Sequence, residues 1–224
     1  MIKPASKPVP APAPAPVPDG DTEQRILEAA RRVFVRRGTA GARMQEIAQE
    51  AGVNQALLHY YFRSKDRLAE AVFRQVAGRI IPTVFEILGS DAPIEEKVER
   101  FVHLYIDSLS RSPFLPGYIL SELHHHPERA AQLFASAAGI APQRFATPIL
   151  RKLGAQIDER VREGTMRPIA PEQFAANIIS LCIFPFAARP LFRVAFGLDD
   201  AAFARFLEQR RRELPGFFPN ALRP

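Results

Sequence analysis

One stretch, from Ile47 to Phe62, constrains the fold of this chain more than any other. It predicts two short helices joined by a tight turn. Gly52 can adopt the left-handed conformation that ends a helix, and Asn54 is a favourable N-cap for the next helix. Leu58 and Phe62 lie four residues apart and therefore face one core. Two helices held in this way can present the second helix to the major groove of DNA.

Further helices are expected on both sides of this stretch. Asp21 or Thr22 can cap a helix that runs to about Arg37 and stops at Gly38, and its apolar residues share one face: Ile26, Leu27, Ala30, Val33 and Phe34. Ser64 can cap a long helix that leads away from the turn. Three short helices make too small a unit to end there, so the apolar face of the long helix must continue into a second body of protein.

The order of these features resembles the N-terminal domain of TetR-family transcriptional regulators over roughly residues 22–70. The matching positions are Gly38, Ile47-Ala48, Ala51-Gly52-Val53, Leu58, Tyr61-Phe62, Ser64-Lys65 and Leu68. The resemblance implies a DNA-binding domain followed by a ligand-binding and dimerisation domain, with repression relieved by the ligand. Three positions depart from the family pattern, which usually has Ser or Thr at Arg43, Tyr at His59 and often His at Tyr61. The helix cap at Arg43 and the operator sequence therefore do not carry over.

Composition fits a DNA-binding protein with two domains. The chain has 224 residues, 47% of them hydrophobic, and a net charge of +6. That charge permits binding to polyanions. It contains no apolar run of 18 or more residues, and no apolar leader segment is visible at the N-terminus. The single cysteine, Cys182, excludes an internal disulfide and suits a reducing compartment. We therefore expect a cytoplasmic protein.

The first twenty residues form a separate segment. Seven of them are proline, alternating with Ala and Val. Such a segment has little surface to bury, so we expect a disordered, extended, polyproline-like arm over residues 1–20. It is either a spacer or a basic arm that touches DNA near the first helix.

The rest of the chain is expected to be helical, with no convincing strand pattern. We predict an all-α protein of nine or ten helices, with a helix-turn-helix domain over residues 21–68 and a helical ligand-binding and dimerisation domain over residues 69–224. A helix is expected over about Ile94–Ser110, and a short helix that ends at His125 follows it. Further helices are expected over Pro127–Ala138, Pro142–Glu163 and Pro171–Phe184, and from Asp199 or Asp200 to about Leu214.

In the second helix of the predicted helix-turn-helix, the residues that do not pack against the core should face DNA. Gln55 can bond bidentately to adenine, Ala56 can contact a thymine methyl group, and His59 can donate to a base or a phosphate. Tyr60 is expected to bond a phosphate. Lys65 and the N–H groups of the helix start beside it can form a phosphate clamp, and Arg43 can act in the same way.

Several side chains of the second domain are candidates for other sites. A small apolar or amphipathic effector is expected to contact His103, Tyr105, Tyr118 and Phe145. The run His124-His125-His126 invites a metal hypothesis, but consecutive helical residues point about 100° apart and cannot close on one ion, so we expect no metal site. No cofactor is expected.

The C-terminal helices carry more phenylalanine than two helices need for a core. This surplus predicts a homodimer interface, because such interfaces are more apolar than the general surface. The resemblance implies that the last two long helices form it, and the candidate residues are Phe174, Ile178, Cys182, Phe203, Phe206 and Leu207.

Enzyme motifs are missing from the sequence. It has no Gly-x-Ser-x-Gly, no phosphate-binding glycine loop, no His-Glu-x-x-His and no paired cysteines. We therefore predict a DNA-binding transcriptional regulator and not an enzyme. Its partners should be a palindromic DNA operator, a second copy of the chain and a small-molecule effector. The alternative is a helical interaction module that has lost DNA binding. The sequence does not reveal the operator, the effector, the regulated genes, or whether the protein represses or activates.

Overall fold

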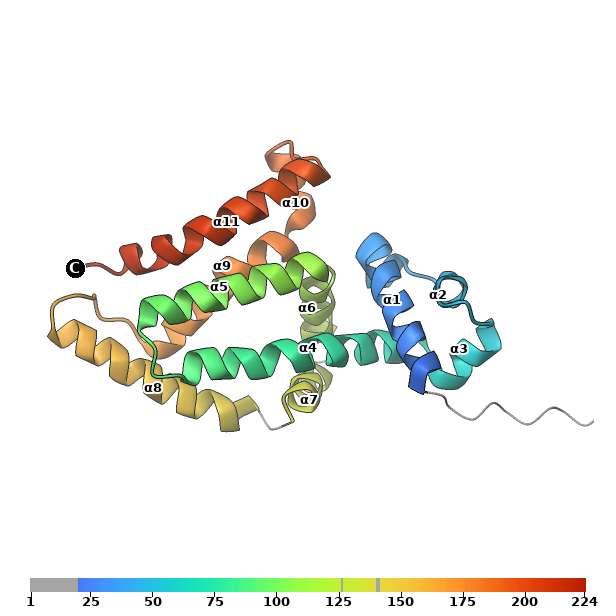
Figure 1. Ribbon diagram of the computed structural model, residues 1–224, viewed down its shortest axis with the longest axis horizontal. Helices are drawn as coiled ribbons and strands as arrows, with labels where there is room; N and C mark the ends of the chain where they lie inside the picture. Colours follow the sequence, from blue (N-terminus) through green and yellow to red (C-terminus); the bar gives the residue numbers. More distant parts are fainter. Residues whose placement is uncertain (1–19, 126, 140–141) are drawn as a thin grey trace, which may run out of the picture.

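The computed structural model describes residues 20–125, 127–139 and 142–224 (Figure 1). These residues form eleven α-helices and no strand, so the all-α prediction is confirmed with one helix more than expected. The additional helix is α10 (Arg189–Ala195), which is only seven residues long and has a proline in its first turn. A helix this short has too few residues to show a clear apolar period in sequence.

The first three helices form a small head with its own core. They are α1 (Gly20–Gly41), α2 (Met44–Ala51) and α3 (Gln55–Tyr61). The predicted stop at Gly38 is confirmed as a kink inside α1, where φ is +68° and ψ is 168°. The side chains of Val33, Phe34, Ile47 and Leu58 are all fully buried, so the predicted apolar faces meet in the head.

Helix α4 (Lys65–Gly89) joins the head to the rest of the molecule. Its first turns bury Leu68 and Val72, and its last turns bury Val84 and Ile87. The helix passes Pro82 without ending. Figure 1 shows the head at one end of α4 and the larger helical body at the other. Helix α4 therefore contributes buried residues to both parts.

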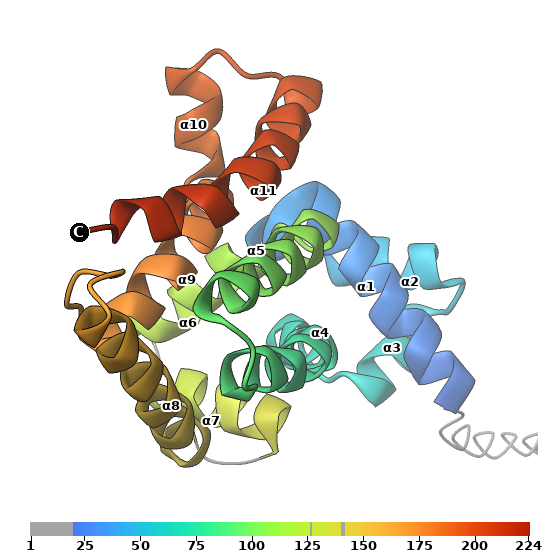
Figure 2. The same ribbon diagram turned by 60° about the vertical axis from the view of Figure 1, so that its left-hand side comes forward.

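The body is built around α5 (Ile94–Arg111). Val98, Phe101 and Val102 on this helix have no exposed surface. Helices α4 and α11 lie beside α5 in both ribbon views (Figures 1 and 2). The remaining helices of the body are α6 (Leu115–His125), α7 (Pro127–Ala138), α8 (Pro142–Arg162) and α9 (Pro171–Ala187).

Helix α11 (Asp200–Ala221) runs seven residues beyond the predicted end near Leu214. Pro215 directly follows the predicted end, and a proline inside a helix removes a backbone hydrogen bond. Packing outweighs that loss. Phe218 is 5% exposed, and its ring meets the ring of Phe174 edge-on at 4.9 Å. The backbone N–H of Arg167 also donates to the carbonyl oxygen of Leu222 over 2.8 Å, which holds the end of the helix.

No single helix of the described residues is long and apolar enough to cross a membrane. Helices α9 and α10 satisfy that test only as a pair, and the pair is bent by 70° at the break between them.

Candidate nucleic-acid interface

The turn between α2 and α3 is closed by the hydrogen bonds that its sequence predicts. Gly52 adopts φ +67° and ψ 32°, the left-handed conformation. The backbone N–H of Val53 donates to Ala48 over 3.0 Å, which satisfies a carbonyl at the end of α2. The side-chain oxygen of Asn54 then accepts from the N–H of Leu57 over 2.7 Å and caps α3. This pair of caps fixes the direction in which α3 leaves the turn.

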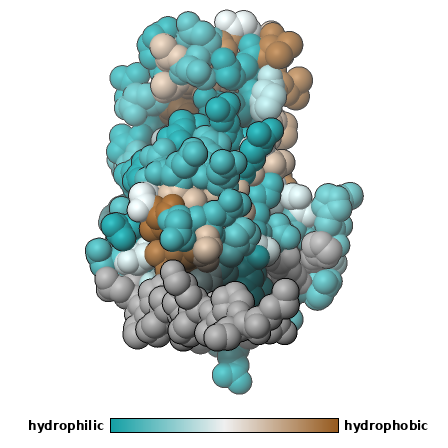
Figure 3. All heavy atoms as spheres, turned by 90° about the vertical axis from the view of Figure 1, so that its right-hand side faces the viewer, coloured by the Kyte–Doolittle hydropathy of each residue, from teal (hydrophilic) through white to brown (hydrophobic). Residues whose placement is uncertain are grey.

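One face of α3 is buried and the other is open to solvent. Leu58 is fully buried, whereas Gln55, Ala56, His59 and Tyr60 are exposed. These four residues follow a helical period, so they form one surface on the outside of the head. Viewed from the end of the molecule that carries the head, the surface is largely hydrophilic (Figure 3). The structure therefore brings together the four candidate DNA-binding residues of α3.

Arg43 lies at the start of α2, as predicted, and its side chain does not cap the helix. Its backbone is extended, with φ −115° and ψ 140°, and its side chain is exposed. Because this side chain accepts no hydrogen bond from the first turn, the N–H groups there keep their capacity to bind an anion. Arg43 and the start of α2 can thus contact one phosphate together.

Lys65 is positioned differently from the prediction. Its Nζ donates to the carbonyl oxygens of Ala40 over 2.9 Å and Ala42 over 3.3 Å, so the ammonium group points at the end of α1. An ammonium group has three hydrogens, and two are used within the head. The predicted clamp is corrected accordingly: Lys65 first fixes the 40–43 loop, and one hydrogen remains for a phosphate.

Arg63 was not identified from the sequence. It is exposed in the short connection between α3 and α4, directly after the exposed face of α3. Its charge next to the predicted reading helix was the available signal. We include Arg63 among the cations that can contact a DNA phosphate.

Two arginines of α1 hold α2 in place. Arg32 Nε and Arg36 Nη2 each donate to Glu50 over 2.8 Å. These hydrogen bonds lower the pKa of the Glu50 carboxyl below its ordinary value. The contact keeps α2 oriented on α1 and so supports α3 beyond it.

The predicted effector residues are distributed through the body. Tyr105 stacks on Phe101 with ring centroids 4.4 Å apart, and burial raises the pKa of Tyr105 to about 12. Tyr118 is 6% exposed and its ring lies 5.9 Å from that of Phe73. His103 is half-buried on α5, and the side chain of Phe145 lies outside the part of the chain that can be described. Five cavities found among the described residues are lined by other side chains.

Five of the six predicted interface residues lie inside a single chain. Phe174, Ile178, Cys182, Phe203 and Leu207 are each at most 7% exposed, and only Phe206 is half-buried. They pack within the body of one chain and leave little surface for a second copy, so their role in an interface stays a prediction. Burial also raises the pKa of the Cys182 thiol to about 12.

The apolar surplus is exposed on the opposite face of the same helices. Phe184 on α9 is 55% exposed and Phe217 on α11 is 59% exposed. Phe217 lines a groove together with Leu181, Phe206 and Arg210. The guanidinium group of Arg210 donates to the carbonyl oxygen of Leu181. Both faces of α9 are apolar, and for that reason the sequence pattern did not show which face points inward.

The histidine run offers no metal geometry in what can be described. Nδ1 of His125 lies 2.8 Å from the carbonyl oxygen of Ser121, and His126 lies outside the described residues. Within those residues no group of three or more His, Cys, Asp or Glu side chains is placed to hold an ion.

Comparison with known proteins identifies the class that this fold and surface define. Residues 26–72 match the family described as "Bacterial regulatory proteins, tetR family". Residues 91–214, more than half of the chain, match the family described as "Tetracyclin repressor-like, C-terminal domain". The chain belongs to the TetR family of helix-turn-helix transcriptional regulators.

Its relatives are regulators and not enzymes. The chain is 31% identical over 103 residues to the HTH-type transcriptional regulator BetI of Rhizobium meliloti, a match covering 46% of this chain and 49% of BetI. It is also 31% identical over 123 residues to the HTH-type transcriptional repressor SCO4008 of Streptomyces coelicolor, covering 53% of this chain and 62% of that protein. The chain thus spans about half of BetI and less than two thirds of SCO4008.

The fold is similar to that of the ketosteroid transcriptional regulator KstR2 of Mycobacterium tuberculosis. The TM-score is 0.59, with 92% of this chain and 97% of that chain covered. The two sequences are 15% identical, so this likeness concerns the fold alone.

Proposed function

We propose that this protein binds a specific DNA operator as a homodimer and represses transcription until a small apolar or amphipathic ligand releases it. The observation that carries the proposal is the exposed face of α3, with Gln55, Ala56, His59 and Tyr60 held outward on a well-capped helix. Residues 21–68 would form the DNA-binding domain and residues 69–224 the ligand-binding and dimerisation domain.

The chemistry of this face suits the major groove. The Gln55 amide can pair bidentately with adenine, the Ala56 methyl group can meet the methyl group of thymine, and His59 can donate to a base edge. Tyr60, at the edge of the same face, would bond a phosphate and fix the register. This combination reads a sequence, whereas cations alone would bind any duplex.

The phosphate contacts would come from residues around that face. Arg43 at the start of α2 and Arg63 after α3 are both exposed cations on the head. Lys65 would contribute its remaining hydrogen while it holds the 40–43 loop. Each such contact releases counterions, so the affinity should fall steeply with salt.

Dimerisation would use the outer face of α9 and α11. Phe184 and Phe217 are exposed there, and covering them removes apolar surface from water. A two-fold pair would set two copies of α3 about 34–36 Å apart, one turn of DNA, on a palindromic operator.

The effector would act through α4, the helix that the head and the body share. We retain His103, Tyr105, Tyr118 and Phe145 as the candidate contacts in the body. Tyr118 is buried, so a ligand must displace neighbouring side chains or helices to reach it, whereas Tyr105 is half-buried beside the core. The ligand can shift α4 only if it binds the released arrangement more tightly than the DNA-bound one.

A salt titration of DNA affinity tests this proposal. Fluorescence anisotropy with the full chain and a labelled duplex should show log K falling linearly with log salt, at a slope of about −0.9 for each phosphate contacted. The alternative is an interaction module without DNA binding. A folded chain that binds no duplex at low salt would favour that alternative and overturn the proposal.

A further inference from the structure

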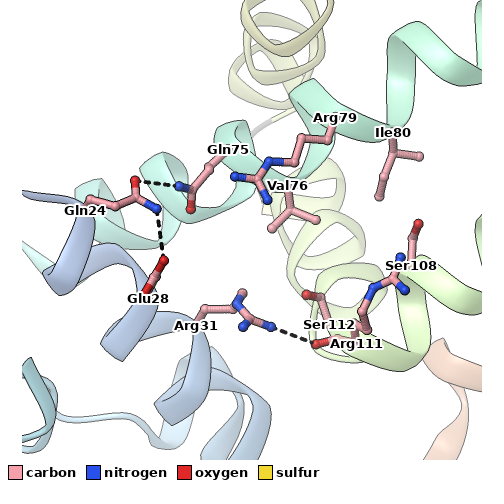
Figure 4. Close-up of a pocket in the computed structure, with 10 residues that line it drawn as sticks. All are labelled: Gln24, Glu28, Arg31, Gln75, Val76, Arg79, Ile80, Ser108, Arg111 and Ser112. Carbon is pink, nitrogen blue, oxygen red and sulfur yellow. Dashed lines mark hydrogen bonds between the residues drawn. The ribbon is translucent and has the colours of Figure 1, made fainter.

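A cavity of about 250 Å³ lies where the head meets the body (Figure 4). Its walls come from three helices, with Arg31 on α1, Arg79 on α4, and Ser108, Arg111 and Ser112 on or directly after α5. The predicted effector residues lie elsewhere, so this cavity is separate from the site expected in the body.

The lining of the cavity is cationic. Three arginines and one carboxylate, Glu28, contribute to it. Arg31 donates through Nη1 to the backbone carbonyl of Arg111 over 3.3 Å, and Glu28 accepts from the Gln24 amide over 3.2 Å. Within the described ranges none of the three guanidinium groups has a carboxylate oxygen within 4.0 Å. Three like charges without an acidic partner repel one another across this junction.

Two largely buried serines also line the cavity. Ser108 is 7% exposed and Ser112 is 2% exposed. Neither hydroxyl makes a hydrogen bond with any described residue, and Figure 4 shows both beside the guanidinium groups. A hydroxyl group without a partner among the described residues can donate a hydrogen bond to an acceptor that enters the cavity.

We propose that this cavity binds the oxyanion group, a carboxylate or a phosphate, of a small molecule. Guanidinium groups recognise both of these through paired N–H donors, and the two serine hydroxyls can add further bonds. Val76 and Ile80 line the α4 side of the same cavity, so an apolar part of the molecule has a surface to cover.

Such a ligand would connect the head to the body. It would bridge Arg31 on α1 to Arg79 on α4 and Arg111 on α5, and so restrict how the head turns on α4. This regulatory consequence rests on the proposed DNA-binding function, since restricting the head can change DNA affinity only if the head binds DNA. The binding site itself does not depend on that function.

Thermal unfolding of the full chain tests the site directly. We would titrate inorganic phosphate and, separately, hexanoate, against sodium chloride at equal ionic strength. At least one probe should give a saturable rise in Tm, reaching about 5 °C when its concentration is a hundred times Kd. A response to phosphate alone or to hexanoate alone identifies which oxyanion the site prefers.

Two variants make the test specific. The double variant Arg79→Gln/Arg111→Gln changes two exposed side chains and should fold, yet lose the probe-dependent rise. Arg74→Gln removes an equivalent charge from α4 at a residue paired with Glu70, and it should keep the rise. No saturable rise with either probe, or an equal rise in the double variant, would overturn the proposal.

Titrating DNA in the presence of the active probe separates the two proposals. The probe should change the DNA affinity of the original chain at least threefold and leave that of the double variant unchanged. A chain that binds the probe but no DNA would contradict the proposed function and leave the anion site standing. A chain that binds DNA but no probe would contradict the anion site alone.

Discussion

The ammonium nitrogen of Lys65 lies 2.9 Å from the carbonyl oxygen of Ala40, and this bond ties the start of α4 to the end of α1. The same nitrogen reaches the carbonyl oxygen of Ala42 over 3.3 Å. Arg43, the next residue, is the N-cap of α2. The position of the phosphate-binding end of α2 therefore depends on a side chain of α4.

Lys65→Met should weaken binding to every DNA sequence by a similar factor. It removes one cation and also releases the 40–43 loop that positions Arg43. We expect the unfolding free energy to fall by about 1 kcal/mol, because two carbonyl groups lose their donor. Anisotropy with an operator and with an unrelated duplex, together with urea unfolding, checks both effects.

Arg43→Gln provides the comparison for this variant. It should reduce the salt slope by about 1 without changing stability, because the substitution keeps the backbone bond from Ile47 to the Arg43 carbonyl and the Arg43 side chain does not cap α2. If Lys65→Met left both the affinity and the stability unchanged, the tie between α1 and α4 would have no energetic role.

Gln55→Ala should relax base preference at one position of each half-site. The loss of a bidentate pair costs about 1–3 kcal/mol of discrimination, while binding to unrelated DNA is retained. Competition assays with operators substituted one base pair at a time measure this change. The matched control is Gln132→Ala, an exposed amide on α7, which should leave preference intact. An unchanged base preference in Gln55→Ala would remove this residue from the reading surface.

Phe217→Arg should separate the dimer. Phe217 is 59% exposed in one chain, on the outer face of α11 where the second copy is proposed to pack, and a charge there would have to be desolvated on pairing. Analytical ultracentrifugation should show a monomer at concentrations where the original chain pairs. Leu120→Arg, at a residue 49% exposed on α6, should remain a dimer. A dimeric Phe217→Arg would place the interface on another surface.

Lys97→Met should destabilise the body. Lys97 is 1% exposed, and its Nζ donates to the carbonyl oxygen of Leu88 over 3.0 Å and to Gln156 over 2.7 Å. The variant leaves the buried bond to Leu88 and the part-buried bond to Gln156 without a donor, so the free energy of unfolding should fall by about 2 kcal/mol. Denaturant unfolding measures it.

Lys152→Met is the control for that prediction. Lys152 forms an ion pair with the exposed Asp91, and pairs of this kind contribute about 0–1 kcal/mol. Equal losses in the two variants would mean that the buried bonds of Lys97 contribute no more than a surface pair.

The helix-turn-helix could be predicted from sequence because each of its signals is local. Gly52 and Asn54 act within a few residues, and the structure shows the left-handed cap and the side-chain cap that their identities predict. Local signals of this kind do not depend on what the rest of the chain does.

The remaining features depend on contacts between distant residues. Lys65 has a long flexible side chain, and only the folded head shows that it turns toward Ala40. The sequence did not show which face of α9 points into the core, because Cys182 and Phe184 are both apolar. In the structure Cys182 is fully buried and Phe184 is 55% exposed. Pro215 marked an end of α11 that packing overrides. The cationic cavity joins residues up to 88 positions apart, from Gln24 to Ser112, and no sequence motif marks it.

The most direct test of the central claim is selection of bound sequences from a random pool of double-stranded DNA with the purified full chain. The account predicts an enriched palindrome whose half-site centres lie about 10 base pairs apart, or a multiple of that spacing. No enrichment by a chain shown to be folded and dimeric would contradict sequence-specific DNA binding, and would make Gln55, His59 and Tyr60 ordinary surface residues.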